Sequence, residues 1–328
     1  SGDWSSDVCS SDLSTKKRRP GLAALLSLVV MGLGQLYNGR LRRAALLFAI
    51  EVLAVLLFAT LGTLLFSFHG VIGMYVAVLV LILIKLFAVI DAFVGARRIG
   101  KTRLQRYQRW YVYIAVLLVA NLVTALVESP IANFSIPAAS MTPTLLVGDY
   151  VASDKNAYRD EAPERGDIVI FKLPKDNWTD YIKRLIGLPG DEIQVTGGRL
   201  HINGKPVARA PAGTVQDGRF QGTAYIETLP NGRRYRILEM RDNGRLDNTP
   251  VYAVPPGHYF VLGDNRDNSL DSRVPDWVGF VPAANLISRA EVVYFSENGT
   301  AKWWAFWRWP QAIRYDRIGL ELGAEKTD

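Results

Sequence analysis

The chain has 328 residues, of which 49% are hydrophobic and 21% charged, and its formal net charge is +7. This composition excludes a wholly disordered chain. The single cysteine, Cys9, excludes a disulfide-stapled fold, a cysteine-rich zinc module and an iron–sulfur cluster. Three histidines leave little material for a histidine metal site, so the sequence implies no metal or cofactor.

Residues 1–13 differ in character from the rest of the chain. They carry three aspartates and no basic residue, and the run from Asp3 to Leu13 resembles a common sequencing-library adapter read in one frame. We interpret them as a non-native, adapter-derived leader and leave them out of the reasoning on the fold. The alternative is a natural polar leader without folded structure.

The positive charge lies in the apolar half of the chain. Residues 14–110 hold fourteen lysines and arginines against only Glu51 and Asp91, whereas residues 111–328 are close to neutral. Bases that flank apolar stretches are typical of membrane proteins rather than of nucleic-acid-binding proteins. Nucleic acid is therefore not an expected partner.

Apolar stretches predict a polytopic membrane region of about three segments over residues 14–110 and a last transmembrane helix over residues 111–127. A helix needs roughly 20 residues to span a bilayer. The loop between the last two stretches carries six bases, which favours a cytoplasmic position and an outward direction for the last helix. The stretches cover residues 21–37, 44–66, 71–95 and 111–127.

Two topologies remain open at the beginning of this region. The basic cluster at residues 16–19 lies on the wrong side of the membrane if the stretch 21–37 spans once. Either that stretch is a short hairpin or interfacial segment with both ends inside, or the chain has four spans and an external N-terminus. Both topologies place residues 128–328 outside.

Two charged side chains and a glycine pair interrupt the apolar stretches. Lys85 and Asp91 lie within one stretch, and an intramembrane charge suggests a functional site. Snorkelling or a local pair explains them better, because Asp91 is near the cytoplasmic end. Gly32 and Gly34 follow no predicted strand, which indicates close helix packing rather than a dinucleotide-binding loop.

Beyond residue 127 the hydrophobic period shortens, and a mostly β domain is predicted over residues 128–320. It contains a polar, Gly- and Arg-rich inserted subdomain at about residues 204–250, and residues 321–328 follow as a tail. Strand-length runs between turn signals cover residues 168–171, 259–262 and 292–295, and a hairpin is predicted from residues 193–195 and 200–202.

Three residue clusters stand out in the β half: Ser135 to Leu145, Tyr181 to Asp191, and Gly263 to Arg273. In this order they resemble the signature boxes of bacterial type I signal peptidase, a membrane-bound serine–lysine endopeptidase. The resemblance covers roughly residues 111–320 and includes the inserted subdomain between the second and third boxes. The earlier residues, with the run Gly32 to Gly39, look like an extra N-terminal membrane region fused to the peptidase.

The chemistry can also be argued from the residues themselves. Serine is a weak nucleophile until a base removes its proton, and lysine can be that base when burial lowers its pKa. Strand alternation places Lys183 on one face with Tyr181 and Leu185, and Arg184 on the other. We expect Ser140 as the nucleophile and Lys183 as the base, and the resemblance independently implies these roles. The histidines, His69, His201 and His258, are expected to be structural.

The resemblance implies roles for further residues. Ser269 matches the family serine whose hydroxyl orients the lysine amine, and the backbone N–H of Ser140 would serve the oxyanion hole. A polar scaffold would hold the loop under the dyad by charge-assisted pairs. Its expected members are Arg184, Asp264, Asp271 and Arg273.

The resulting prediction is an endopeptidase of the bacterial inner membrane that removes signal peptides from exported preproteins through an acyl-enzyme. Its expected partners are signal peptides, the lipid bilayer and the secretion translocon. A self-cleaving serine–lysine regulator is one alternative, but the membrane stretches speak against it. A membrane scaffold with a degenerate peptidase domain is another, and its only support is Ala138.

Aromatic and basic side chains interleave near the C-terminus. This pattern suits the headgroup region of a bilayer, and packing within the domain is the equal alternative. The residues are Lys302, Trp303, Trp304, Phe306, Trp307, Arg308 and Trp309.

One residue departs from the family pattern. The common pattern has Ser-x-Ser at the nucleophile, where the first serine donates to the oxyanion, and Ala138 stands at that position here. One such donor contributes about 3–4 kcal/mol. We expect Ala138→Ser to leave the turnover of a preprotein in detergent unchanged or to raise it. A large loss of turnover would show instead that Ala138 is needed for packing.

Overall fold

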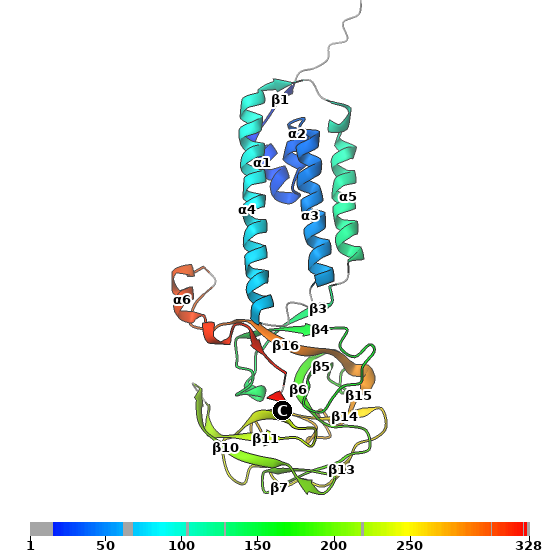
Figure 1. The fold of residues 1–328 in the computed structure, drawn as a ribbon, viewed down its shortest axis with the longest axis vertical. Coiled ribbons are helices and arrows are strands. Elements are labelled where there is room, and N and C mark those ends of the chain that lie inside the picture. The colour runs from blue at the N-terminus through cyan, green and yellow to red at the C-terminus, as the bar shows by residue number, and fades with distance from the viewer. Residues whose placement is uncertain are drawn as a thin grey trace, which may run out of the picture. The chain divides into compact units, whose positions relative to one another are not determined.

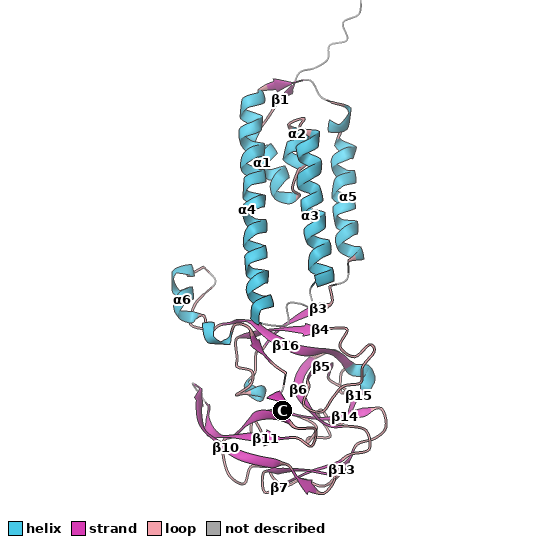
Figure 2. Ribbon diagram, viewed as in Figure 1, coloured by secondary structure: helices cyan, strands magenta, loops and turns pink. Residues whose placement is uncertain are grey.

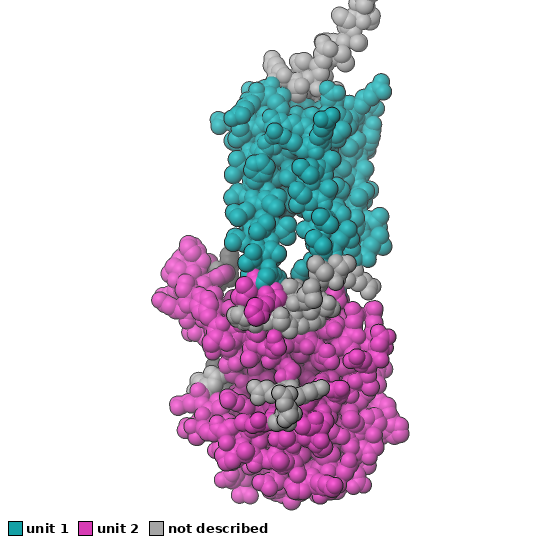
Figure 3. Space-filling model, in the orientation of Figure 1, with its two compact units in different colours: residues 1–62, 73–129 teal, residues 63–72, 130–328 magenta. Residues whose placement is uncertain are grey.

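The computed structural model divides into two compact units, formed by residues 1–62 with 73–129 and by residues 63–72 with 130–328 (Figure 3). The predicted leader at residues 1–13 lies outside the described residues. Those are residues 16–61, 68–102, 105–127, 129–217, 220–302, 304–323 and 325–326.

The first unit is helical (Figure 2). Many of its exposed side chains are Leu, Val, Ile and Phe. Among the described residues, one helix, His69–Ile99, is long and apolar enough to cross a bilayer. The prediction of several spans therefore stays a prediction. The elements of this region are β1 (Lys16–Lys17), α1 (Pro20–Val29), α2 (Leu33–Tyr37), α3 (Leu41–Leu61), α4 (Phe68–Ile99), β2 (Lys101–Thr102), η2 (Arg106–Gln108) and α5 (Trp110–Leu126).

The first apolar stretch forms two short helices instead of one continuous helix. The ten residues of α1 measure about 15 Å, half the thickness of a bilayer core. Gly32 adopts a left-handed φ of 97° where α2 begins. A Cβ at Gly34 would lie 2.1 Å from the carbonyl oxygen of Ala23, so the predicted close packing at these glycines is confirmed.

The two charged residues of the third apolar stretch, Lys85 and Asp91, form ion pairs with residues of α3 and of the turn before it. Lys85 Nζ lies 3.5 Å from Glu51 Oε1, and Asp91 Oδ1 lies 3.3 Å from Arg40 and 2.9 Å from Arg43. Lys85 and Asp91 do not pair with each other. These contacts agree with the local-pair interpretation of both residues.

The second unit is mostly β, and its strands are paired antiparallel (Figure 1). The largest sheet has the order β15-β14-β6-β5-β16-β4-β3, and β17 also pairs with β16. The predicted strand runs fall within β5, β14 and β16. The strands are β3 (Ile131–Ser135), β4 (Asp149–Asp154), β5 (Ile168–Lys172), β6 (Asp180–Gly187), β14 (His258–Leu262), β15 (Val281–Pro282), β16 (Leu286–Ser296) and β17 (Leu320–Glu321).

Two smaller sheets accompany it, with the orders β10-β11-β12-β18 and β13-β7-β8-β9. The predicted hairpin is the pair β7–β8. Within the stretch 321–328, predicted as a tail, Glu321 belongs to β17 and Glu325–Lys326 form β18, which pairs with β12. The strands are β7 (Glu192–Thr196), β8 (Arg199–Ile202), β9 (Lys205–Pro206), β10 (Ala208–Asp217), β11 (Phe220–Thr228), β12 (Arg233–Glu239), β13 (Tyr252–Ala253) and β18 (Glu325–Lys326).

Strand β5 is buried on both faces. Ile168 and Ile170 join one apolar cluster with Met141 and Leu145, whereas the alternate residues Val169 and Phe171 join another. A strand enclosed on both faces reads as a continuous apolar run, which is why residues 168–171 stood out in the sequence. Its partner β6 is paired with it in register along the whole of β5.

Candidate active site

Ser140 lies in a short turn that follows the edge strand β3. The turn is the 3₁₀ helix η3 (Ala139–Met141), and it is anchored by Met141 and Leu145, which are fully buried. Ser140 itself is half-buried. The first N–H groups of a helical turn have no acceptor within the turn, so the backbone N–H of Ser140 is available for other acceptors.

Lys183 is the counterpart of Ser140 on β6. Its Nζ donates hydrogen bonds of 2.8 Å to Ser140 Oγ and 2.8 Å to the carbonyl oxygen of Ile182. Its side chain is only 3% exposed. Burial lowers the pKa of Lys183 to about 8, while the carboxylates of Asp271 and Asp264 act in the opposite direction. The structure thus brings together the two residues that we expected to form the dyad.

Arg184, the next residue on β6, is engaged elsewhere. Its guanidinium is 1% exposed and binds both carboxylate oxygens of Asp264, at 2.8 and 2.7 Å. It also donates to the carbonyl oxygen of Gly166 at 2.8 Å. This bidentate pair ties the third sequence cluster to the main sheet.

Asp271 and Arg273 form a second bidentate pair within the third cluster. Arg273 donates to the two carboxylate oxygens at 2.9 and 2.8 Å and to the carbonyl oxygen of Arg266 at 2.7 Å. Asp271 also accepts the backbone N–H of Gly263. Each carboxylate that acts on Lys183 is therefore matched by its own arginine, which limits its effect on the lysine.

Ser269 lies on the same cavity wall, but its expected bond to the lysine is not formed in this structure. Its side chain is 8% exposed, and its hydroxyl bonds neither Lys183 nor Ser140 but lies close enough to Asp271 to help lower the pKa of that carboxyl. A Cβ at Gly263 would lie 2.2 Å from Ser269 Oγ and 2.5 Å from the carbonyl oxygen of Ser140. The absence of a side chain at Gly263 therefore allows the third cluster to pack closely against the serine turn.

Asn265 is a site residue that the sequence reasoning missed. Its backbone N–H donates to the carbonyl oxygen of Ser140 at 3.1 Å, and its side-chain amide donates to that of Ala139 at 3.2 Å. Asn265 thereby fixes the serine turn to the third cluster. Asn265 belongs to the third cluster, but its position in the sequence does not distinguish it from an asparagine that only forms a turn.

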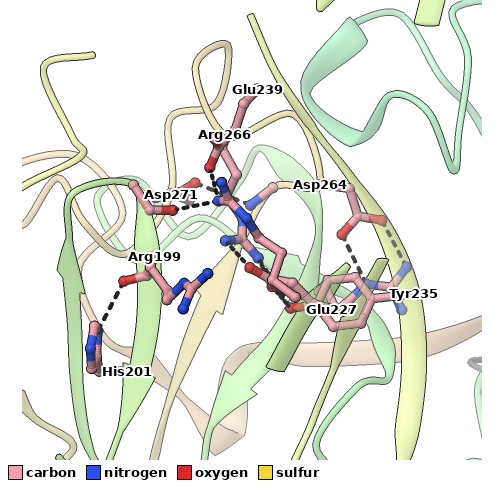
Figure 4. A network of polar contacts seen from close by, with 12 residues as sticks. Arg199, His201, Glu227, Tyr235, Glu239, Asp264, Arg266 and Asp271 are labelled. Atoms are coloured by element: carbon pink, nitrogen blue, oxygen red, sulfur yellow. Dashed lines mark hydrogen bonds and ion pairs between the residues drawn. The ribbon is translucent and has the colours of Figure 1, made fainter. Parts of the chain in front are cut away.

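A buried polar network was also missed (Figure 4). Arg266 binds Glu227 at 3.0 Å through one guanidinium nitrogen and contacts the hydroxyl of Tyr235 at 3.1 Å through another, while that hydroxyl donates to Glu227 at 2.6 Å. All three side chains are at least nine-tenths buried. Glu227 and Tyr235 come from β11 and β12, so their meeting with Arg266 depends on the sheet topology.

Ser140 and Lys183 open onto a cavity of about 550 Å³. Strand β6 runs along the cavity wall and pairs with β5 on one side and with β14 on the other. The pairing with β14 begins only at Arg184, so on that side no described strand pairs with residues 180–183. Within the part of the chain that the structure describes, no group of three His, Cys, Asp or Glu side chains could hold a metal ion. Apolar lining comes from Ile136, Ala138, Ile182, Leu246 and Leu270.

A family model described as signal peptidase, peptidase S26, matches residues 107–295. Signal peptidase I of Rickettsia massiliae is 39% identical over 253 residues, and that of Rickettsia akari 40% over 254, each covering 66% of this chain and 92% of the relative. A solved signal peptidase I from Enterococcus faecalis is 29% identical, with a TM-score of 0.25, over 39% of this chain and 97% of that chain.

The Glu227–Arg266 pair leads to a stability prediction. Glu227→Gln keeps the side-chain shape but leaves a buried guanidinium without its counter-charge, which costs about 3–5 kcal/mol. The midpoint of thermal unfolding of the β unit, followed in the full-length protein in detergent, should fall by about 6–20 °C. The exposed Glu192→Gln is the matched control and should change little. Equal midpoints for both variants would contradict the prediction.

Proposed function

The chain belongs to the peptidase S26 family of signal peptidases, and we propose that it removes signal peptides from exported preproteins through a dyad of Ser140 and Lys183. The observation that carries this mechanism is the 2.8 Å contact between Lys183 Nζ and Ser140 Oγ at the wall of the cavity. The same contact weakens the alternative of a degenerate scaffold, since both reactive groups are present and in reach of each other.

The reaction follows from the two side chains. Neutral Lys183 accepts the hydroxyl proton of Ser140 while Oγ attacks the carbonyl carbon of the bond to be cleaved. The ammonium then gives this proton to the leaving amine, and the signal peptide remains as an ester on Ser140. Lys183 next removes a proton from a water molecule, which hydrolyses the ester and restores the serine. Burial favours each return of the lysine to its neutral form.

The negative oxygen of the tetrahedral intermediate needs hydrogen-bond donors. The backbone N–H of Ser140 is positioned for this at the start of η3, whereas Ala138 has no side-chain donor to add. We propose Ser269 as support for the lysine side of the dyad, reached by a small movement of its hydroxyl from beside Asp271. Arg184, Asp264, Asp271 and Arg273 act as scaffold.

Backbone geometry supports binding of an extended substrate. Residues 180–183 of β6 present an edge to the cavity with which no described strand pairs, so a peptide can add to it by strand pairing. Ile136 and Ile182 face the cavity beside Ser140. Their apolar side chains would accept the small residues that precede a signal-peptide cleavage site.

We further propose a multi-pass protein of the bacterial inner membrane with its active site outside, and with the bilayer and the translocon as partners. Helix α4 and the basic residues of the helical half support this topology. Trp304, Phe306 and Trp307 are 53%, 70% and 63% exposed, which favours a headgroup contact over packing within the domain. Trp303 lies outside the described residues.

Preprotein processing by the full-length enzyme in detergent tests the mechanism. Ser140→Ala and Lys183→Ala should each lower turnover by at least about a thousandfold, because nucleophile and base act as a unit. Ser135→Ala and Lys205→Ala, which change an exposed serine and an exposed lysine of the same unit, should behave like the wild type. Cleavage that survives both dyad substitutions would overturn the mechanism.

The pH dependence provides a second test. Only the neutral form of Lys183 can accept a proton, and its pKa is about 8. The value of kcat/KM should therefore rise about tenfold per pH unit below 8 and level off above it. His201 and His258 do not line the cavity, so His201→Gln and His258→Gln should leave this rise of kcat/KM with pH unchanged. A rise of kcat/KM centred near pH 6.5, lost when a histidine is substituted, would identify a histidine as the base instead.

A further inference from the structure

A loop from the inserted segment forms part of the rim of the cavity. It connects β12 with β13, and we call residues 241–248 the rim loop. Arg245 and Leu246 of this loop line the same cavity as Ser140 and Lys183. Arg245 is exposed, whereas Leu246 is half-buried.

The rim loop is held in place from two sides. Asp267 of the third cluster accepts the backbone N–H groups of Met240 at 2.7 Å and Arg241 at 3.1 Å. On the other side, the carbonyl oxygen of Asp247 accepts the N–H of Gly198 at 3.0 Å, from the turn between β7 and β8. A Cβ at Gly244 would lie 2.4 Å from Asp267 Oδ1, so the loop lies tightly against the third cluster. The backbone of Arg245 is thus fixed relative to the reacting residues.

The other charged side chains of the cavity wall already have partners. Asp180 pairs with Lys172 at 2.6 Å, Arg266 pairs with Glu227, and Asp267 is used by backbone N–H groups. Arg245 differs from these, since its guanidinium has no ion pair or hydrogen bond within the described residues. A guanidinium that is held at a rim without a carboxylate is suited to bind one from outside.

We propose that Arg245 is a specificity-determining residue that favours preproteins carrying an aspartate or glutamate within three residues of the cleaved bond. This inference rests on the proposed function. An extended chain advances about 3.3 Å per residue, so only a few side chains on either side of that bond lie within the cavity. Among them, a carboxylate gains a charge-assisted hydrogen bond to Arg245 that its amide counterpart does not.

A set of matched peptides tests this with the full-length enzyme. Each peptide carries Asp or Asn at one of the six positions around the cleaved bond, and the ratio of kcat/KM for Asp over Asn is measured at each position. For a partly exposed ion pair, the wild type should prefer Asp by about two- to fivefold at one position or more. Arg245→Gln should bring this ratio to about one, and Arg245→Glu should invert it.

Arg199→Gln is the matched control, because Arg199 is exposed on the neighbouring β8 and does not line the cavity. It should keep the wild-type ratios. The proposal is overturned if the wild type shows no preference at any position, or if Arg245→Glu keeps the wild-type preference.

Binding of the same peptides to the Ser140→Ala enzyme, followed by fluorescence anisotropy, separates this proposal from the proposed function. Tighter binding of Asp peptides that Arg245→Glu reverses supports the role of Arg245 even if the wild type cleaves none of them. Equal binding of Asp and Asn peptides together with normal cleavage would retain the peptidase and remove Arg245 from its specificity.

Discussion

The proposed dyad depends on one buried amine that loses its proton more readily than an ordinary lysine. Lys183 is 3% exposed, and its nearest polar atoms are a serine hydroxyl and a backbone carbonyl oxygen. Neither carries a charge that would stabilise an ammonium, and burial alone disfavours it. Strand β5, buried on both faces, holds β6 and therefore the lysine in this position.

The surrounding ion pairs can be understood from this requirement. Asp264 and Asp271 are close enough to favour the charged lysine, yet each is bound on both oxygens by an arginine. Fully buried carboxylates are tolerated only with such partners. The two pairs thus fix the third cluster beneath the dyad without adding a net negative charge beside Lys183.

Local features of the site could be predicted from the sequence, and those that depend on topology could not. Alternation along β6 was sufficient to place Lys183 and Arg184 on opposite sides, and the apolar run of β5 was visible directly. Nothing local indicates that Glu227, 39 positions before Arg266, becomes its counter-ion. The break of the first apolar stretch follows from the left-handed Gly32, which hydropathy does not record.

The inserted segment also belongs to the site, although it contains neither dyad residue. Its strands β11 and β12 supply Glu227 and Tyr235, which bind Arg266. The residue before Arg266, Asn265, holds the serine turn through the carbonyl oxygen of Ala139. Its loop supplies Leu246 to the cavity wall. Asp267 accepts the backbone N–H groups of Met240 and Arg241, so the inserted segment is bound to the same third cluster that contains Asn265. The inserted segment and the serine turn are thus both fastened to the third cluster.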